Sequence, residues 1–138
     1  MYVDHDALFA ASELIPIENR PHQIGELADR FGITLRTIRF YEHKGLIRPR
    51  RIGANMRIYD VADVARLGLI VTCRRFRFSV DEIAALLAAR DALDAEAFHR
   101  RFTEVLARRH AELTSEIADL ERTRGELFGF LTDLRRQR

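Results

Sequence analysis

The chain has 138 residues and a formal net charge of +2, from 23 Lys and Arg against 21 Asp and Glu, so it holds one compact domain with an attached element and hardly two independent cores. Its single cysteine, Cys73, excludes an internal disulfide, and no run reaches the roughly 18 apolar residues of a membrane span. The N-terminus lacks the basic start of a secretory signal, so we expect a cytoplasmic protein with no membrane partner.

Residues 1–21 are predicted to form a flexible N-terminal extension. Residues 1–19 contain four acidic residues and neither Lys nor Arg, which gives this stretch a net charge of −4. A short apolar run around Phe9 is cut by Pro16 and Pro21, so we expect one helical turn at most. We assign no chemistry to this segment.

Two short helices are predicted next. Apolar residues at helical spacing from Ile24 to Phe31 indicate a first helix, which Gly32 ends in the left-handed conformation. Thr34 offers an N-cap hydroxyl to a second helix, and Gly45 terminates it. Two helices this short, joined by a tight turn, are typical of a helix-turn-helix.

The second helix has two chemically different faces. With Ile38 at the centre of the inward face, the residues within about 60° of it are Thr34, Leu35, Tyr41 and Glu42. The outward face consists of Arg36, Phe40 and His43, flanked by Thr37, Arg39 and Lys44. A monomer gains nothing by exposing a large aromatic ring, so this basic face is the candidate binding surface.

Basic residues continue beyond Gly45 into a predicted hairpin. Residues 20–60 hold nine Lys and Arg against four acids, a local charge of +5. Arg50 and Arg51 precede a turn that contains Asn55, and residues 56–59 alternate in polarity, which predicts a two-stranded wing with a basic tip. Two strands are unstable alone, so the wing must pack on the helices. Charge alone fits a solvated basic surface as well as a nucleic-acid footprint.

Two further helices should complete the core. Asp60 can cap a third helix whose apolar face includes Cys73 and Phe76, which favours a core role for the cysteine over a sensor role. Ser79 and Glu82 form a capping box that opens a fourth helix, through about residue 90. The predicted winged helix-turn-helix domain therefore spans residues 22–92.

The C-terminal third, residues 93–138, predicts a coiled-coil dimerisation helix. Leucines recur at strict seven-residue spacing from Leu106 to Leu134, and an unbroken helix would span roughly 60 Å. Its apolar stripe needs a partner, for which the candidate residues are Leu106, Leu113, Ile117, Leu120, Leu127, Leu131 and Leu134. His110 and Arg124 interrupt the stripe, either to set the register or by snorkelling to its edge. Gly125 and Gly129 predict a kink or an early end.

The sequence contains no motif that indicates a catalytic or metal-binding site. No two of the five histidines are at metal-ligand spacing with a cysteine or a carboxylate pair, and the glycines lack the lysine and the strand–loop–helix context of a phosphate loop. We therefore expect no enzyme activity and no cofactor.

Several motifs together resemble the MerR-type (mercury-resistance-type) transcriptional regulators. These are IGELADRFGITLRTIRFYEHKGLI from residue 24, MRIYD at the end of the wing, and FSVDEI from residue 78. The resemblance implies a mainly α fold, in which a winged helix-turn-helix precedes a long helix that pairs in an antiparallel coiled coil. It also implies a homodimer that binds a dyad in double-stranded DNA and distorts the promoter spacer so that RNA polymerase engages both promoter elements.

The resemblance also suggests residue roles. Arg36 and Thr37 would face the major groove, Arg39 with Phe40 and Tyr41 would grip the backbone, and Arg57 would reach phosphate or the minor groove. With the outward face and the wing added, the candidate DNA-binding residues are Arg36, Thr37, Arg39, Phe40, Tyr41, His43, Arg50, Arg51, Asn55 and Arg57.

Three departures from the family pattern matter. Phe40 stands where tyrosine is common, and Gln23 replaces the usual Thr or Ser, which weakens the first N-cap by about 1 kcal/mol. The cysteines of the metal sensors are absent from the start of the dimer helix and beyond it. The signal therefore stays open: a pocket among the third to fifth helices senses a ligand, or the protein senses nothing.

We predict a sequence-specific transcriptional regulator. One alternative is an architectural or excisionase-like winged-helix protein with no promoter role. A second is an interaction module whose apolar stripe binds a different coiled-coil partner.

Overall fold

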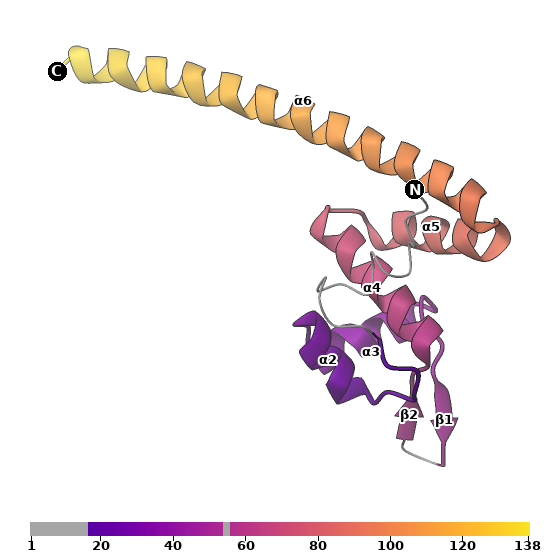
Figure 1. The fold of residues 1–138 in the computed structure, drawn as a ribbon. Coiled ribbons are helices and arrows are strands. Elements are labelled where there is room, and N and C mark those ends of the chain that lie inside the picture. The colour runs from indigo at the N-terminus through magenta and orange to yellow at the C-terminus, as the bar shows by residue number, and fades with distance from the viewer. Residues whose placement is uncertain (1–16, 54–55) are drawn as a thin grey trace. The chain divides into compact units, whose positions relative to one another are not determined.

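The computed structural model describes residues 17–53 and 56–138, so Asn55 and most of the N-terminal extension lie outside the described residues. The chain is mainly helical with a small two-stranded sheet, as predicted (Figure 1). The elements, in chain order, are α2 (Ile24–Phe31), α3 (Leu35–His43), β1 (Arg50–Ile52), β2 (Met56–Ile58), α4 (Val61–Arg75), α5 (Val80–Ala92) and α6 (Ala95–Arg136). They fall into two compact units, one ending at Ala95 and the other formed by Glu96–Arg138.

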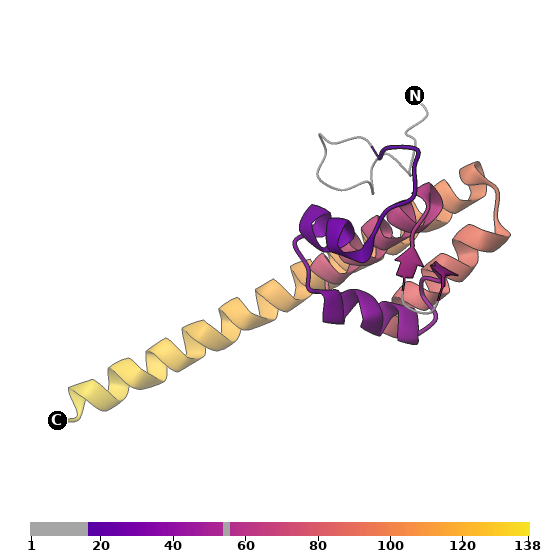
Figure 2. The same cartoon turned by 90° about the horizontal axis from the view of Figure 1, so that it is seen from below.

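The predicted helix ends are confirmed. Gly32 adopts φ +63° and ends α2, and Gly45 adopts φ +74° just after α3. This left-handed conformation is unfavourable for residues that have a Cβ atom, so glycine is preferred at both positions. The hydroxyl oxygen of Thr34 accepts a hydrogen bond from the backbone N–H of Thr37 at 3.1 Å. Gln23 makes no side-chain cap to α2, as its departure from the family pattern predicts. Figure 2 shows α2 and α3 side by side.

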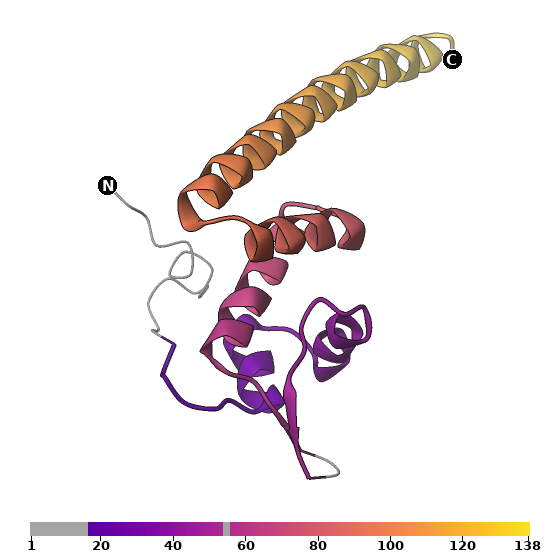
Figure 3. The same ribbon diagram turned by 90° about the vertical axis from the view of Figure 1, so that its right-hand side faces the viewer.

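The wing is anchored by more than its own two strands. β1 and β2 pair antiparallel, with Arg51 opposite Arg57. Beyond β2, the chain pairs with the segment that precedes α2: His22 N–H donates to Tyr59 O at 2.8 Å, and Tyr59 N–H donates to His22 O at 2.9 Å. Figure 3 shows the hairpin projecting beyond the helices of its unit.

Helices α4 and α5 both begin with reciprocal caps. Asp60 accepts from the Asp63 N–H at 2.8 Å, and the Asp63 carboxylate accepts from the Asp60 N–H at 3.1 Å. Ser79 and Glu82 form the predicted capping box, with hydrogen bonds of 3.1 and 3.0 Å. These caps satisfy backbone donors that a helix start leaves unpaired, so both helices have well-defined origins.

The core of the first unit draws on every one of its helices and on the end of the wing. Its largest fully buried side chains are Tyr59, Phe78, Leu27, Ile38, Ile47, Leu67, Leu69, Ile70, Ile83 and Leu87. Cys73 is buried among them, and burial raises the pKa of its thiol to about 12, which confirms a core role.

The core position predicted for Phe76 is wrong. Phe76 is 44% exposed, because α4 ends at Arg75 and the chain leaves the helical path at once. Arg77 takes φ +66°, and this turn brings Phe78 into the buried place instead. The helical period that predicts a buried Phe76 therefore ends one residue earlier, at Arg75.

The long helix α6 runs unbroken for 42 residues, through both Gly125 and Gly129. The early end considered at these glycines is therefore wrong, and the helix is continuous past Gly125. At about 1.5 Å per residue its length is roughly 60 Å. Within the described residues, no helix has both the length and the apolar composition that a bilayer crossing requires.

Candidate nucleic-acid interface

Helix α3 presents a basic and aromatic surface to solvent. Arg36, Arg39 and His43 are exposed, and Phe40 is 43% exposed, while Ile38 on the other side is fully buried. The ammonium of Lys44 lies over the Phe40 ring, 5.7 Å from its centroid, and makes a cation–π contact with it. The two faces therefore lie as the helical spacing predicts, apart from Thr34 and Leu35, which are exposed at the start of the helix.

Two of the predicted contact residues have other roles in the structure. Tyr41 is buried rather than exposed, so its ring belongs to the core and not to the outward surface. Burial raises the pKa of its hydroxyl, and the nearby Arg74 opposes that shift. Thr37 is half-buried, and its hydroxyl lies 2.9 Å from that of Thr34, so it takes part in the helix cap.

The wing is tied to α3 by one carboxylate. Arg57 Nε lies 3.1 Å from Glu42 Oε1 and 2.9 Å from Oε2, and Arg51 lies 3.8 Å from Oε1. The register explains this geometry, because Arg51 and Arg57 are directly opposite each other and share one face of the hairpin. The Arg57 pair is only partly exposed, whereas Arg51 is exposed and its longer contact is worth little. Arg57 therefore orients the wing relative to α3.

Tyr59 fixes the end of the wing in the core. Its ring is fully buried, and burial raises the pKa of its hydroxyl to about 12, with the negative charge of Glu42 adding to the effect. The Arg-x-Tyr ending of the wing thus has two distinct structural roles. Arg57 binds the α3 carboxylate, and Tyr59 supplies the buried anchor.

Sequence reasoning missed the role of His22. This side chain is buried, its Nε2 lies 2.9 Å from Glu18 O, and its Nδ1 lies 3.4 Å from a Glu26 carboxylate oxygen. Arg20 joins the same cluster by ion pairs to Glu18 and Glu26. No periodic pattern marks an isolated histidine ahead of a helix, so nothing in the sequence signalled that it pairs with the wing.

A second basic segment also escaped the sequence analysis. Arg74, Arg75 and Arg77 are exposed at the C-terminal end of α4. Arg74 donates to Phe78 O at 2.8 Å and influences the Tyr41 hydroxyl, which places this end of α4 next to α3. The sequence signal for this segment is the three arginines in the string CRRFRF.

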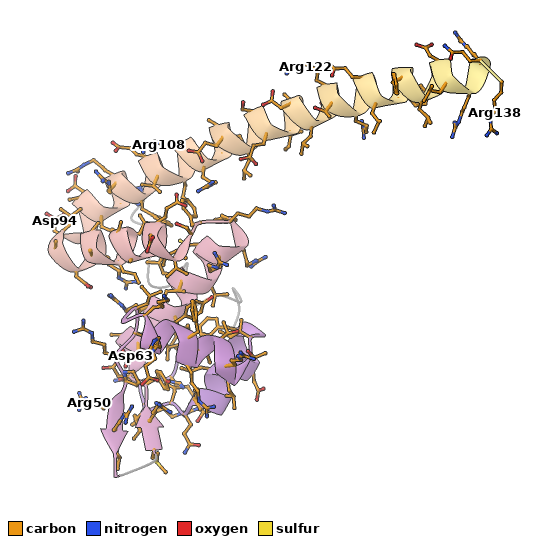
Figure 4. All side chains as sticks on the ribbon, turned by 180° about the vertical axis from the view of Figure 1, so that it is seen from behind. Arg50, Asp63, Asp94, Arg108, Arg122 and Arg138 are labelled. Carbon is orange, nitrogen blue, oxygen red and sulfur yellow. The ribbon has the colours of Figure 1, made fainter. Side chains whose placement is uncertain are left out.

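The apolar stripe on α6 lies open in the single chain. Leu106 and Leu113 are half-buried, and Leu120 is 69% exposed. The other predicted seam residues are also exposed, namely Ile117, Leu127, Leu131 and Leu134. Phe128 and Phe130 are exposed beside the end of the stripe and widen it, although the heptad pattern of leucines did not include them. Figure 4 shows side chains along the whole of α6, with Arg108 and Arg122 labelled.

Residues 17–53 and 56–138 contain no cluster of side chains suited to binding a metal ion. No group of three or more His, Cys, Asp or Glu side chains there has the geometry of a metal site. The thiol of Cys73, the chain's one cysteine, is buried and has a raised pKa, which disfavours the thiolate that a metal would need.

Two family models match most of the chain. One, described as "MerR HTH family regulatory protein", matches residues 23–90, and the other, described as "MerR, DNA binding", matches residues 64–129. A curated relative, the HTH-type transcriptional regulator ZntR homolog of Haemophilus influenzae, is 36% identical over 106 residues. The alignment covers 76% of this chain and 77% of the relative.

Solved structures share the fold. The transcription regulator PbrR691 from Ralstonia metallidurans CH34, in complex with lead(II), is 34% identical with a TM-score of 0.55, over 83% of this chain and 86% of that chain. The MerR family regulator HiNmlR, which lacks the sensor domain and is bound to promoter DNA, has a TM-score of 0.59 over 75% of this chain and 77% of that chain. Its identity is 21%, so this likeness concerns the fold alone.

Proposed function

Because this chain belongs to the MerR family of regulators, we propose that it acts as a homodimer in which two copies of α3 read the two halves of one DNA dyad. The chain is a sequence-specific DNA-binding transcriptional regulator. The observation that carries the proposal is the exposed basic face of α3, combined with an apolar stripe on α6 that a single chain leaves in water.

Base readout would come from the outward face of α3. Arg36 is in the second position of this helix and is exposed, so its guanidinium can bind the O6 and N7 atoms of a guanine in the major groove. Arg39, Arg50 and Arg51 would bind phosphates and supply affinity without sequence preference. Phe40 would pack against sugar, and Arg57 would hold the wing in place through Glu42.

The dimer would form through antiparallel α6 helices. In a parallel pair in register, Arg124 would lie opposite its own copy in the seam, which is repulsive. In an antiparallel pair centred on Ile117 and the partner's Leu120, Arg124 lies opposite the partner's Leu113 and His110 opposite the partner's Leu127. Each polar side chain then meets a leucine and can extend to the edge of the seam. Residues 22–92 would serve as the DNA-binding domain and residues 93–138 as the dimerisation helix.

At promoters, we infer that the dimer distorts the spacer so that RNA polymerase engages both elements, and that it acts in the cytoplasm by binding alone, without catalysis. Family membership supports this inference. The architectural alternative is not favoured, because the curated relative is named a transcriptional regulator. In vitro transcription from a bound promoter with a long spacer separates the two, because an architectural protein would leave initiation unchanged.

Footprinting of genomic fragments with the purified protein tests the proposal and identifies the site. We expect a protected dyad between promoter elements. If the dimer contacts about eight phosphates, log K against log[salt] has a slope of about −7. A slope of about −2 would contradict this interface. Light scattering on the same sample would show a dimer, whereas a monomer at micromolar concentration would point to a different coiled-coil partner.

A further inference from the structure

The wing has an apolar face turned away from the carboxylate that ties it to α3. Arg50 pairs with Ile58 and Ile52 pairs with Met56, so these four side chains share one face of the hairpin, which we call the back face of the wing. Arg51 and Arg57 lie on the other face, toward Glu42. Ile52 is 58% exposed and Met56 is 49% exposed. Two large apolar side chains in water next to a basic residue make a surface suited to a partner that is both apolar and acidic.

A groove beside this face is partly built by the chain that leads into the domain. Its volume is about 380 Å³, and the wing residues Arg50, Arg51, Ile52 and Ile58 line one side of it. Asn19, Arg20 and Pro21 line another side, and Asp60, Val61 and Asp63, at the beginning of α4, complete it. Figure 4 labels Arg50 on the wing and Asp63 at the beginning of α4. Asn19, which lines the groove, follows residues 1–16 closely in the chain, so this segment is covalently attached near the groove.

The composition of residues 1–16 matches the groove. They contain three acids and no Lys or Arg, and their apolar side chains include Leu8, Phe9, Leu14 and Ile15. The groove itself is lined by three arginines and two aspartates, and residues 20–60 as a whole carry a net charge of +5, so the surrounding field attracts an acidic segment. Sixteen residues reach up to about 50 Å when extended, and Asn19 lines the same groove as the wing residues. A short tether also raises the effective concentration to the millimolar range, so a weak contact suffices.

We propose that residues 1–16 dock on the back face of the wing and lower the affinity of the protein for DNA. The apolar side chains of the segment cover Ile52 and Met56, and its carboxylates pair with Arg50 and neutralise part of the field that attracts phosphate. DNA and the segment compete for the same arginine. The inference rests on the DNA-binding function proposed above, and the contact makes that function adjustable from within the chain.

A single tryptophan tests the docking directly. The chain contains no Trp, so in Ile52→Trp the indole reports only on the back face. We expect its emission to lie at a shorter wavelength in the full chain than in the same chain with Leu8, Phe9, Leu14 and Ile15 changed to Ser. Equal emission in both would overturn the proposal. Emission that shifts with protein concentration instead of with these four changes would assign the face to a second copy, which also overturns it.

Charge neutralisation tests the effect on DNA. Asp4→Asn, Asp6→Asn and Glu13→Gln, combined in the full chain, should raise operator affinity about threefold to tenfold at 50 mM salt and less than about twofold at 300 mM, because salt screens the competing attraction. The matched control changes three exposed acids on the outer side of α6, Glu104→Gln, Glu126→Gln and Asp133→Asn. It alters the net charge equally and should leave affinity within about twofold.

The two proposals fail in different ways. If the unchanged protein and both triple variants show no site-specific binding, the proposed DNA-binding function is wrong. If all three bind one site with equal affinity at low salt, the function stands and the docking proposal is wrong. An equal gain in both triple variants would mean that net charge alone is responsible, which also contradicts docking.

Discussion

Arg36 combines the features expected of a base-reading side chain. It is exposed in the first turn of α3, a helix whose start is fixed by the Thr34 cap and whose other side is sealed by Ile38. The surrounding residues fix the position of Arg36, and in the proposed complex its guanidinium would supply the donors for guanine.

Arg36→Ala should therefore lower affinity for the cognate site by about 1–3 kcal/mol, while binding to random DNA stays nearly unchanged. Fluorescence anisotropy with both DNAs at one salt concentration measures the difference. Arg101→Ala, an exposed arginine on α6, serves as the control. An equal loss on random DNA would reassign Arg36 to the backbone.

Tyr59 leads to a prediction about alkaline stability. The pKa of its hydroxyl is about 12 in the folded protein and about 10 in an unfolded chain, so the unfolded state loses its proton first. The contribution of this pKa difference to the free energy of unfolding is about 2–3 kcal/mol. It is complete below about pH 10 and is lost as the pH rises to about 12. Tyr59→Phe should reduce this loss.

Urea unfolding at pH 7 and at several pH values above 9 measures the effect. In the part of the chain that the structure describes, the Tyr59 hydroxyl has no hydrogen-bond partner, so Tyr59→Phe should leave stability at pH 7 unchanged or increase it. Cys73 also has a raised pKa and leaves part of the alkaline loss in both proteins. A loss above about 1 kcal/mol at pH 7 would mean that the hydroxyl has a partner after all.

Among the elements, α6 depends most on a partner. Leu120 is mostly exposed in the single chain, so changing it has little effect on the fold of the chain itself. Leu120→Asp should abolish the dimer, because it places a charge in the middle of the seam. Operator binding should be lost with it.

Sedimentation equilibrium at micromolar concentration tests this prediction. Ala118→Asp adds the same charge to the same helix, two residues away and on the outer side of the heptad, and should leave the dimer intact. A dimer that survives Leu120→Asp would mean that the seam lies on another face of α6.

The elements also show which features local sequence determines. The ends of α2, α3 and α5 were predictable because each is set by residues a few positions apart in the sequence. These residues are Gly32, Thr34, Gly45 and the Ser79 capping box. The contacts between distant segments were not. His22 meets Tyr59, and Glu42 meets Arg57, at separations that neither a helical nor a strand period encodes. Phe76 shows the same limit, since the path of the chain beyond α4 decides where its ring lies, whereas helical spacing placed Tyr41 correctly on the inward face of α3.

For the molecule as a whole, the candidate interface is one assembly and not a helix with a separate wing. Glu42 belongs to α3 but holds the wing, and Tyr59 ends the wing but lies in the core. The faces of α3 and the existence of a wing followed from the sequence. The residues that hold them together, and the second arginine segment at the end of α4, emerged only from the three-dimensional contacts.

In the proposed dimer, the glycines of α6 have a further consequence. Gly125 and Gly129 lie on the outer side of the heptad, so they leave the seam intact while each lowers intrinsic helix stability by about 1 kcal/mol. The last turns of α6 then depend on the partner for their helicity, and assembly and helix formation are thermodynamically linked. Far-UV circular dichroism should show helicity per residue rising with concentration through the dimerisation range, and Gly125→Ala with Gly129→Ala should flatten that rise. Helicity that is independent of concentration across the transition would contradict this linkage.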